Sequence, residues 1–224
     1  MNDTLLACVE LESAANPAAS VIWLHGLGAD GNDFVPVVRE LALPSTFPVR
    51  FVFPHAPIRP VSINNGLRMR AWYDIAGADF NNRADLAGVR ESQAQIEALI
   101  AREVRRGIAS NRIVLAGFSQ GGAVALYAGL RHAERLAGIM SLSAYLVAAD
   151  TLRDEAEAAN RDVPIFMAHG SADPMVRFAW GEASWRALVQ AGYSVEWHTY
   201  PMEHSVCMEE IAAISAWLQR ILRS

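Results

Sequence analysis

Cysteine, net positive charge and long apolar runs are all scarce in this sequence. Its 224 residues include only two cysteines, Cys8 and Cys207, which are too few for a disulfide framework and indicate a reducing compartment such as the cytoplasm. The N-terminus has neither a basic segment nor a long apolar one, so we expect no signal peptide. The longest largely apolar stretch, residues 137–149, contains two serines and is too short to span a bilayer, so we expect no stable membrane anchor.

The charge balance is mildly acidic. The formal net charge is −5 at pH 7, and the sequence has no basic cluster that would indicate a nucleic-acid surface. Hydrophobic residues make up 52% and charged residues 19%, which excludes a disordered chain. The length and the absence of repeats or composition breaks predict one α/β domain over residues 1–224.

Apolar runs rich in β-branched residues alternate with segments of helical period. This alternation predicts a mostly parallel central sheet with helices on both faces. The expected strands are residues 5–11, 20–24, 49–53, 112–117, 136–142, 164–169 and 195–200. The expected helices are residues 33–43, 85–106, 120–131, 178–190 and 208–222. Residues 54–83 have no clear period, and a loop of this length is usually functional, for example as the wall of a pocket.

The most informative motif is G-x-S-x-G, at residues 117–121. An apolar strand candidate precedes it and an alanine-rich helix candidate follows it, which is the context of a nucleophile elbow. Ser119 would stand at the sharp turn with its hydroxyl exposed. Gly117 and Gly121 would allow the strand and the helix to pass too close together for side chains. The motif therefore indicates a nucleophilic serine.

A serine hydroxyl needs a base to take its proton and an acid to orient that base. In the α/β enzymes that carry such an elbow, the acid and then the histidine follow the serine along the chain, each in a loop at the carboxyl end of a strand. Asp173 follows the strand candidate 164–169, and His204 follows the strand candidate 195–200. The alternative for Asp173 is a turn or helix-capping role beside a proline. Glu203 and Asp150 are alternative acids, but Glu203 adjoins the base and is badly placed to orient it.

The remaining histidines fit the catalytic order less well and are expected to be structural: His25, His55, His132, His169 and His198. No pair of them has the spacing of a metal site, and the two cysteines form no C-x-x-C motif. We therefore expect no metal site.

Acyl transfer also needs N–H donors that face the developing oxyanion. Gln120 supplies one backbone N–H at the start of a helix, where such groups lack helical partners. The sequence His-Gly-Leu-Gly at residues 25–28 follows an early strand, and we expect the Leu27 N–H to be the second donor. The alternative is that this segment is only a turn.

Five segments together resemble the small carboxylesterases related to acyl-protein thioesterases and lysophospholipases: residues 25–28, 72–74, 117–122, 169–173 and 204–206. The resemblance covers most of the chain. It implies an α/β-hydrolase fold with little or no cap domain, no cofactor, and activity on carboxylic esters or thioesters. It also implies Ser119 as nucleophile, His204 as base and Asp173 as the orienting acid.

One position departs from the family pattern, which usually has glycine before the catalytic histidine, where this chain has Glu203. A carboxylate near His204 would raise the pKa of the imidazole and shift the acidic limb of activity upward. Candidates for the lining of an apolar acyl site, each equally compatible with ordinary packing, are Leu27, Trp72, Tyr73, Phe118 and Met175.

Three functions are compatible with these residues. The first is a carboxylesterase for short to medium acyl chains, acting through an acyl-enzyme intermediate. The second is a dedicated acyl-protein thioesterase or lysophospholipase. The third is a catalytically silent binding protein, which would have no reason to keep the three catalytic residues in order. The expected partner is a small-molecule ester or acyl thioester, and a homodimer is a possible assembly because small enzymes of this kind are often dimers.

Overall fold

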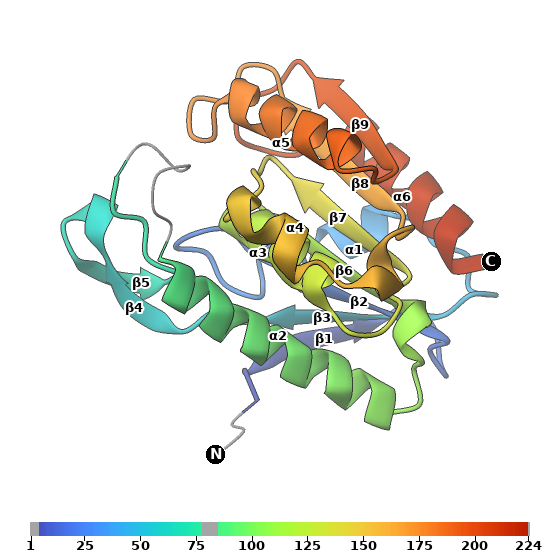
Figure 1. Cartoon of the computed structure of the whole chain (residues 1–224). Helices are drawn as coiled ribbons and strands as arrows, with labels where there is room; N and C mark the ends of the chain where they lie inside the picture. Colours follow the sequence, from blue (N-terminus) through green and yellow to red (C-terminus); the bar gives the residue numbers. More distant parts are fainter. Residues whose placement is uncertain (1–4, 78–84, 224) are drawn as a thin grey trace.

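The computed structural model describes residues 5–77 and 85–223, and a seven-stranded sheet runs through it in the order β1-β3-β2-β6-β7-β8-β9 (Figure 1). Strand β1 is antiparallel to β3, and every other neighbouring pair is parallel. The strands are β1 Cys8–Glu12, β2 Ala19–Leu24, β3 Val49–Pro54, β6 Ile113–Phe118, β7 Gly138–Leu142, β8 Ile165–Gly170 and β9 Val195–Tyr200. The predicted mostly parallel sheet is confirmed.

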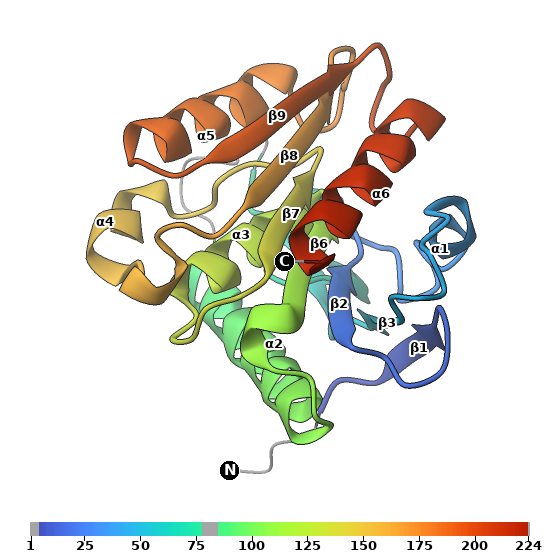
Figure 2. The same ribbon diagram turned by 90° about the vertical axis from the view of Figure 1, so that its right-hand side faces the viewer.

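Helices cover both faces of this sheet. Figure 2 shows α1 and α6 on one side and α2, α3 and α5 on the other. The helices are α1 Val37–Glu40, α2 Leu86–Arg105, α3 Gln120–Arg131, α4 Leu152–Glu155, α5 Phe178–Gln190 and α6 Met208–Arg223. Within the described ranges, no helix is long and apolar enough to cross a membrane.

The two faces hold separate hydrophobic cores because successive side chains of a strand point to opposite sides. In β2, Val21 and Trp23 belong to the core that α6 covers, whereas Ile22 and Leu24 belong to the core under α2 and α3. All six residues of β2 are buried. A strand buried on both faces needs a continuous apolar run. The inner strands could therefore be recognised in the sequence by their apolar runs.

The long segment after β3 contains a feature that the sequence analysis did not predict. Strands β4 (Ile58–Val61) and β5 (Leu67–Arg70) form an antiparallel hairpin that projects from the sheet (Figure 1). Its turn includes Asn65 and Gly66, both with positive φ, 54° and 75°. Asn-Gly is a strong hairpin signal, so the sequence did carry a sign of this turn. Residues 78–83 of the predicted loop lie outside the described residues.

The helix expected at residues 33–43 is much shorter in the structure. Only α1 is helical there, and the residues before it form successive turns in which Val35 and Val37 bond to carbonyls three positions back. Pro36 stands at the N-cap of α1 and has no N–H to continue a helical ladder. By contrast, α3 and α5 begin and end at the predicted residues.

Candidate active site

The loops at the carboxyl ends of three parallel strands bring Ser119, Asp173 and His204 together. Ser119 follows β6, Asp173 lies beyond β8, and His204 lies beyond β9. The Ser119 Oγ atom lies 2.9 Å from Nε2 of His204, and Nδ1 of the same ring lies 2.7 Å from Oδ2 of Asp173. Both distances are within hydrogen-bonding range. The structure therefore joins residues 119, 204 and 173 into one continuous hydrogen-bonded chain.

The backbone of Ser119 has φ 55° and ψ −123°, a conformation that residues other than glycine rarely adopt. Two close approaches surround it. A Cβ atom on Gly117 would lie 2.2 Å from the Gly121 carbonyl oxygen, and one on Gly121 would lie 2.4 Å from that of Leu24. These positions cannot carry side chains without moving the backbone. The strand, turn and helix therefore have the geometry of a nucleophile elbow.

Asp173 uses its two carboxylate oxygens differently. Oδ1 accepts the backbone N–H groups of Met175 and Val176 at 2.8 and 2.9 Å, while Oδ2 faces His204. Asp173 thus has both roles that the sequence allowed: Oδ1 stabilises the turn, and Oδ2 contacts the imidazole. Nε2 of His169 lies 3.5 Å from Oδ2, behind the carboxylate. From the sequence, His169 was expected only to be structural, and its contact with Asp173 was not predicted.

The ring of His204 packs against Phe118, with 4.7 Å between their centroids. Glu203, the departure from the family pattern, is exposed, and so is Asp150, the other alternative acid. Among the hydrogen bonds and ion pairs of the described residues, the acid that contacts His204 is Asp173.

The two expected oxyanion donors belong to adjacent loops. Strands β2 and β6 are neighbours, and Leu24 pairs with Gly117 in their register, so both chains leave the sheet side by side. A Cβ atom on Gly26 would lie 3.4 Å from the Cβ atom of Ser119. The loop that carries Leu27 therefore lies beside the serine, as an oxyanion hole requires.

The other histidines have partners of their own. His132 contacts Glu97 at 2.7 Å, and His198 contacts Glu196 at 3.0 Å. His55 accepts the Gly31 N–H at 3.0 Å. Among the described residues, no group of three or more histidine, cysteine or acidic side chains is placed to hold a metal ion.

The candidates for the acyl site have very different exposures. Trp72 and Tyr73 are only 0% and 1% exposed, and both belong to the hydrophobic core. For these two residues the structure favours ordinary packing, the alternative that the sequence left open. Leu27 and Phe118 are half-buried, while Met175 is 63% exposed. The three residues with exposed surface therefore remain the better candidates for contact with an acyl chain.

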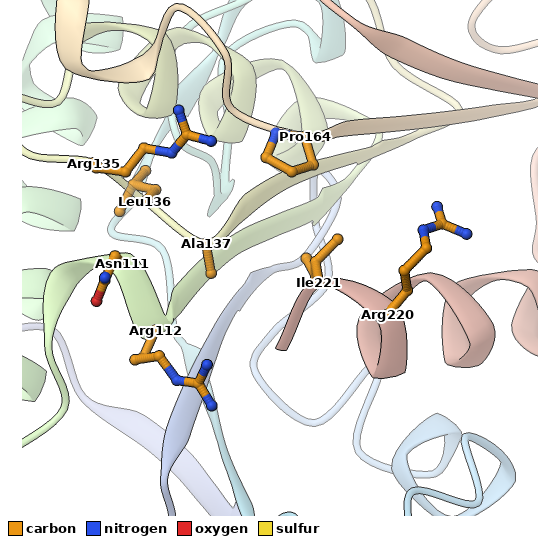
Figure 3. A pocket seen from close by; sticks show the side chains of 8 residues that line it. All are labelled: Asn111, Arg112, Arg135, Leu136, Ala137, Pro164, Arg220 and Ile221. Carbon is orange, nitrogen blue, oxygen red and sulfur yellow. The ribbon is translucent and has the colours of Figure 1, made fainter. Parts of the chain in front are cut away.

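A pocket of about 390 Å³ lies at the opposite end of the sheet, where β6, β7 and β8 begin (Figure 3). The described residues that line it include no serine, histidine or carboxylate. Its arginines extend in different directions in Figure 3, and the Arg135 guanidinium donates to the Asp162 carbonyl oxygen. This pocket therefore has no group that could perform acyl transfer.

Known proteins resemble this chain over nearly its whole length. The model of the family described as phospholipase/carboxylesterase matches residues 6–222. Acyl-protein thioesterase 1 of Neurospora crassa is 40% identical over 215 residues, which span 92% of this chain and 88% of the relative. Among solved structures, SOBER1 of Arabidopsis thaliana has a TM-score of 0.85 at 30% identity, covering 91% of this chain and 99% of that one. Acyl-protein thioesterase 2 of Zea mays has a TM-score of 0.83 at 28% identity, covering 96% and 99%.

The resemblance noted in the sequence is thus confirmed over nearly the whole chain. The chain belongs to the phospholipase/carboxylesterase family, has the α/β-hydrolase fold and is an ester hydrolase.

Proposed function

We propose that Ser119 is the nucleophile of a two-step acyl transfer, with His204 as general base and Asp173 as its orienting acid. Nε2 of His204 takes the Oγ proton while Oγ bonds to the carbonyl carbon of the substrate. The observation that carries this proposal is the hydrogen-bonded chain from Ser119 through His204 to Asp173, with distances of 2.9 and 2.7 Å. Burial of Asp173 supports it, because a buried carboxylate interacts strongly with the imidazolium that forms.

The negative oxygen of the tetrahedral intermediate would accept the backbone N–H groups of Leu27 and Gln120. Collapse of this intermediate breaks the ester or thioester bond, and His204 returns its proton to the departing alcohol or thiol. A water molecule then attacks the acyl-enzyme. His204 takes a proton from that water and gives it to Ser119 as the acid leaves. No metal or cofactor takes part in this scheme, and the whole chain acts as one domain.

The substrate class that we propose is a carboxylic ester with a short to medium acyl chain. The half-buried Leu27 and Phe118 lie in the loop beside Ser119 and next to it in the chain, and the exposed Met175 bonds to Asp173 through its N–H, so these residues offer apolar but open surface. A dedicated thioesterase activity is the second candidate, because the relatives from Neurospora crassa and Zea mays are named acyl-protein thioesterases. A lysophospholipase activity belongs to the same alternative. A cytoplasmic location and a homodimer remain predictions from the sequence.

A substrate panel tests this proposal. The purified chain would be given p-nitrophenyl butyrate, p-nitrophenyl octanoate, a palmitoyl thioester peptide and lysophosphatidylcholine, each with kcat/KM measured. We expect the two short esters to have the highest kcat/KM. If kcat/KM for the palmitoyl thioester is 10-fold or more above that for both esters, the protein is a thioesterase and not a general carboxylesterase. No turnover of any of the four would contradict the hydrolase mechanism itself.

A further inference from the structure

The side chain of Gln120 has a function that its backbone N–H does not explain. It is 2% exposed, and both ends of its amide are used. Its Oε1 accepts the backbone N–H of Trp72 at 2.9 Å, and its Nε2 donates to the Tyr73 carbonyl oxygen at 2.8 Å. The residue after the proposed nucleophile thus binds the main chain of a segment that lies about fifty positions earlier in the sequence. Position 120 therefore fixes this segment against the start of α3.

Trp72 continues the connection toward the other side of the serine. Its indole Nε1 donates to the carbonyl oxygen of His25 at 2.9 Å. Its own carbonyl oxygen accepts the hydroxyl of Ser92, so the backbone of this residue is bonded on both its N–H and its C=O. The indole and the imidazole of His25 also pack together, with 5.3 Å between ring centroids. Trp72 therefore joins Gln120 to the loop that carries the Leu27 N–H.

His25 completes the path. Its Nε2 accepts the backbone N–H of Ala56 at 3.1 Å, so the ring proton must be on Nδ1, which donates to the Gly26 carbonyl oxygen at 2.7 Å. Burial lowers the pKa of His25 to about 4, which keeps the ring neutral and this tautomer in place. The Gly26 carbonyl and the Leu27 N–H belong to one planar trans peptide and point in opposite directions. Fixing the carbonyl therefore fixes the direction of the N–H.

We propose that Trp72 is a positioning residue for the oxyanion hole, acting through Gln120 on one side and His25 on the other. Two successive peptides of the loop are held, the first by the Trp72 indole and the second by the His25 imidazole. The bonds from the Gln120 side-chain amide to the backbone of Trp72 and Tyr73 hold residue 120 at the start of α3. The path thereby sets the separation of the two N–H donors, which must each reach the oxyanion within a few tenths of an ångström. This inference rests on the proposed function, because that function assigns the Leu27 and Gln120 N–H groups to the oxyanion.

The test compares Trp72→Phe with Trp23→Phe. Trp23 is also buried, at 1% exposure, and stacks on Phe34, but its indole N–H has no hydrogen-bond partner among the described residues. Both variants lose a similar ring volume, and only the first loses the bond to His25. With p-nitrophenyl butyrate, we expect kcat of Trp72→Phe to fall on the order of 10-fold to 100-fold with KM within about twofold. Trp23→Phe should keep kcat within about threefold of the wild type.

A transition-state analogue gives a second readout. A trifluoromethyl ketone forms a hemiketal oxyanion with an active serine, so its affinity should fall in Trp72→Phe by the same factor as kcat/KM. Thermal unfolding of both variants shows whether they are folded. If Trp72→Phe does not fold, Gln120→Met, which keeps the backbone N–H and removes the side-chain amide, should show the same loss of kcat. Unchanged kcat and analogue affinity in the folded variant would overturn the inference.

The outcome for the wild type separates this inference from the proposed function. If the wild type reacts with a fluorophosphonate at Ser119 and hydrolyses the ester while the folded Trp72→Phe variant matches it, the positioning role alone is wrong. If the wild type itself neither reacts nor hydrolyses, the proposed function is wrong and the inference falls with it.

Discussion

The Nδ1 atom of His204 lies 2.7 Å from Oδ2 of Asp173, while Oδ1 of the same carboxylate accepts two backbone N–H groups. This division fixes the carboxylate in the plane and direction in which it meets the imidazole. The Asp173 side chain is fully buried and His204 is partly exposed, at 18%. The acid is therefore held by the fold, and the base stays accessible to substrate.

Asp173→Asn should lower kcat on p-nitrophenyl butyrate by about 10⁴-fold, because an amide would select the wrong imidazole tautomer. Steady-state kinetics on the folded variant measures this. The matched control is Asp150→Asn, which changes the exposed alternative acid and should leave kcat unchanged. Loss of activity in the control with activity kept in Asp173→Asn would reverse the assignment of the acid.

Gly121→Ala should destabilise the protein, because its new Cβ would lie 2.4 and 2.5 Å from the Leu24 and His25 carbonyl oxygens. Overpacking against backbone typically costs about 1–3 kcal/mol. Urea unfolding gives the change in the free energy of unfolding. Gly77→Ala is the control, since a Cβ at Gly77 would meet no atom of the described residues within 4 Å. Equal stability of the two variants would show that the elbow and the adjacent loop are less tightly packed than the structure indicates.

Glu103→Gln should cost about 3 kcal/mol of unfolding free energy, because it removes the buried carboxylate that pairs with Arg50, Arg102 and Arg106 and leaves Arg50 with the more exposed Glu12. The Glu103 side chain is 0% exposed and contacts Arg50, itself 9% exposed, at 3.0 Å. Chemical denaturation measures the loss. Glu91 is exposed, at 57%, and contacts Arg59 at 3.3 Å, so Glu91→Gln should cost less than about 1 kcal/mol. Similar losses of unfolding free energy for the two substitutions would show that the buried Glu103 carboxylate stabilises the fold no more than the exposed Glu91.

Glu210 predicts a pH dependence of stability. Burial raises the pKa of this carboxyl from 4.5 to about 8. Because the folded state holds the proton more tightly than the unfolded chain, stability is fully present below pH 4.5 and is lost as pH rises toward about 8. Glu210→Gln removes this loss, so its advantage in unfolding free energy over the wild type should grow between pH 5 and 8.

Denaturant unfolding of the wild type and of Glu210→Gln at several pH values measures this advantage. Glu209→Gln, at the exposed neighbouring position, is the control and should show no such growth. A constant difference between wild type and Glu210→Gln across this range would mean that the pKa of Glu210 is not raised in the folded protein.

The inner strands and two main helices could be predicted because their residues are buried in regular patterns. Helices α3 and α5 have the predicted bounds, and so does β9, although it lies at the edge of the sheet and is only partly buried. The hairpin β4–β5 could not be read from periodicity, because its strands are short and carry exposed apolar residues such as Ile58 and Leu67. The predicted helix at 33–43 failed where Pro36 leaves only four helical residues.

The part of the candidate site that depends on chain order and on the positions of strand ends could be predicted from the sequence. These features place Ser119, Asp173 and His204 at one edge of the sheet. They say nothing about contacts between side chains that are distant in sequence. The bonds from the Gln120 amide to the backbone of Trp72 and Tyr73 became visible only in three dimensions. A buried tryptophan and a tryptophan in a pocket wall look the same in a sequence.

Labelling by a fluorophosphonate probe shows whether Ser119 is an activated nucleophile. The wild type and Ser119→Ala would be incubated with the probe, and intact mass and peptide mapping would locate the adduct, with p-nitrophenyl butyrate turnover measured in parallel. We predict one adduct on Ser119 in the wild type, and in Ser119→Ala no adduct and a loss of turnover on the order of 10⁴-fold or more. Wild-type turnover in a folded Ser119→Ala protein, or an adduct at another serine, would show that Ser119 is not the nucleophile.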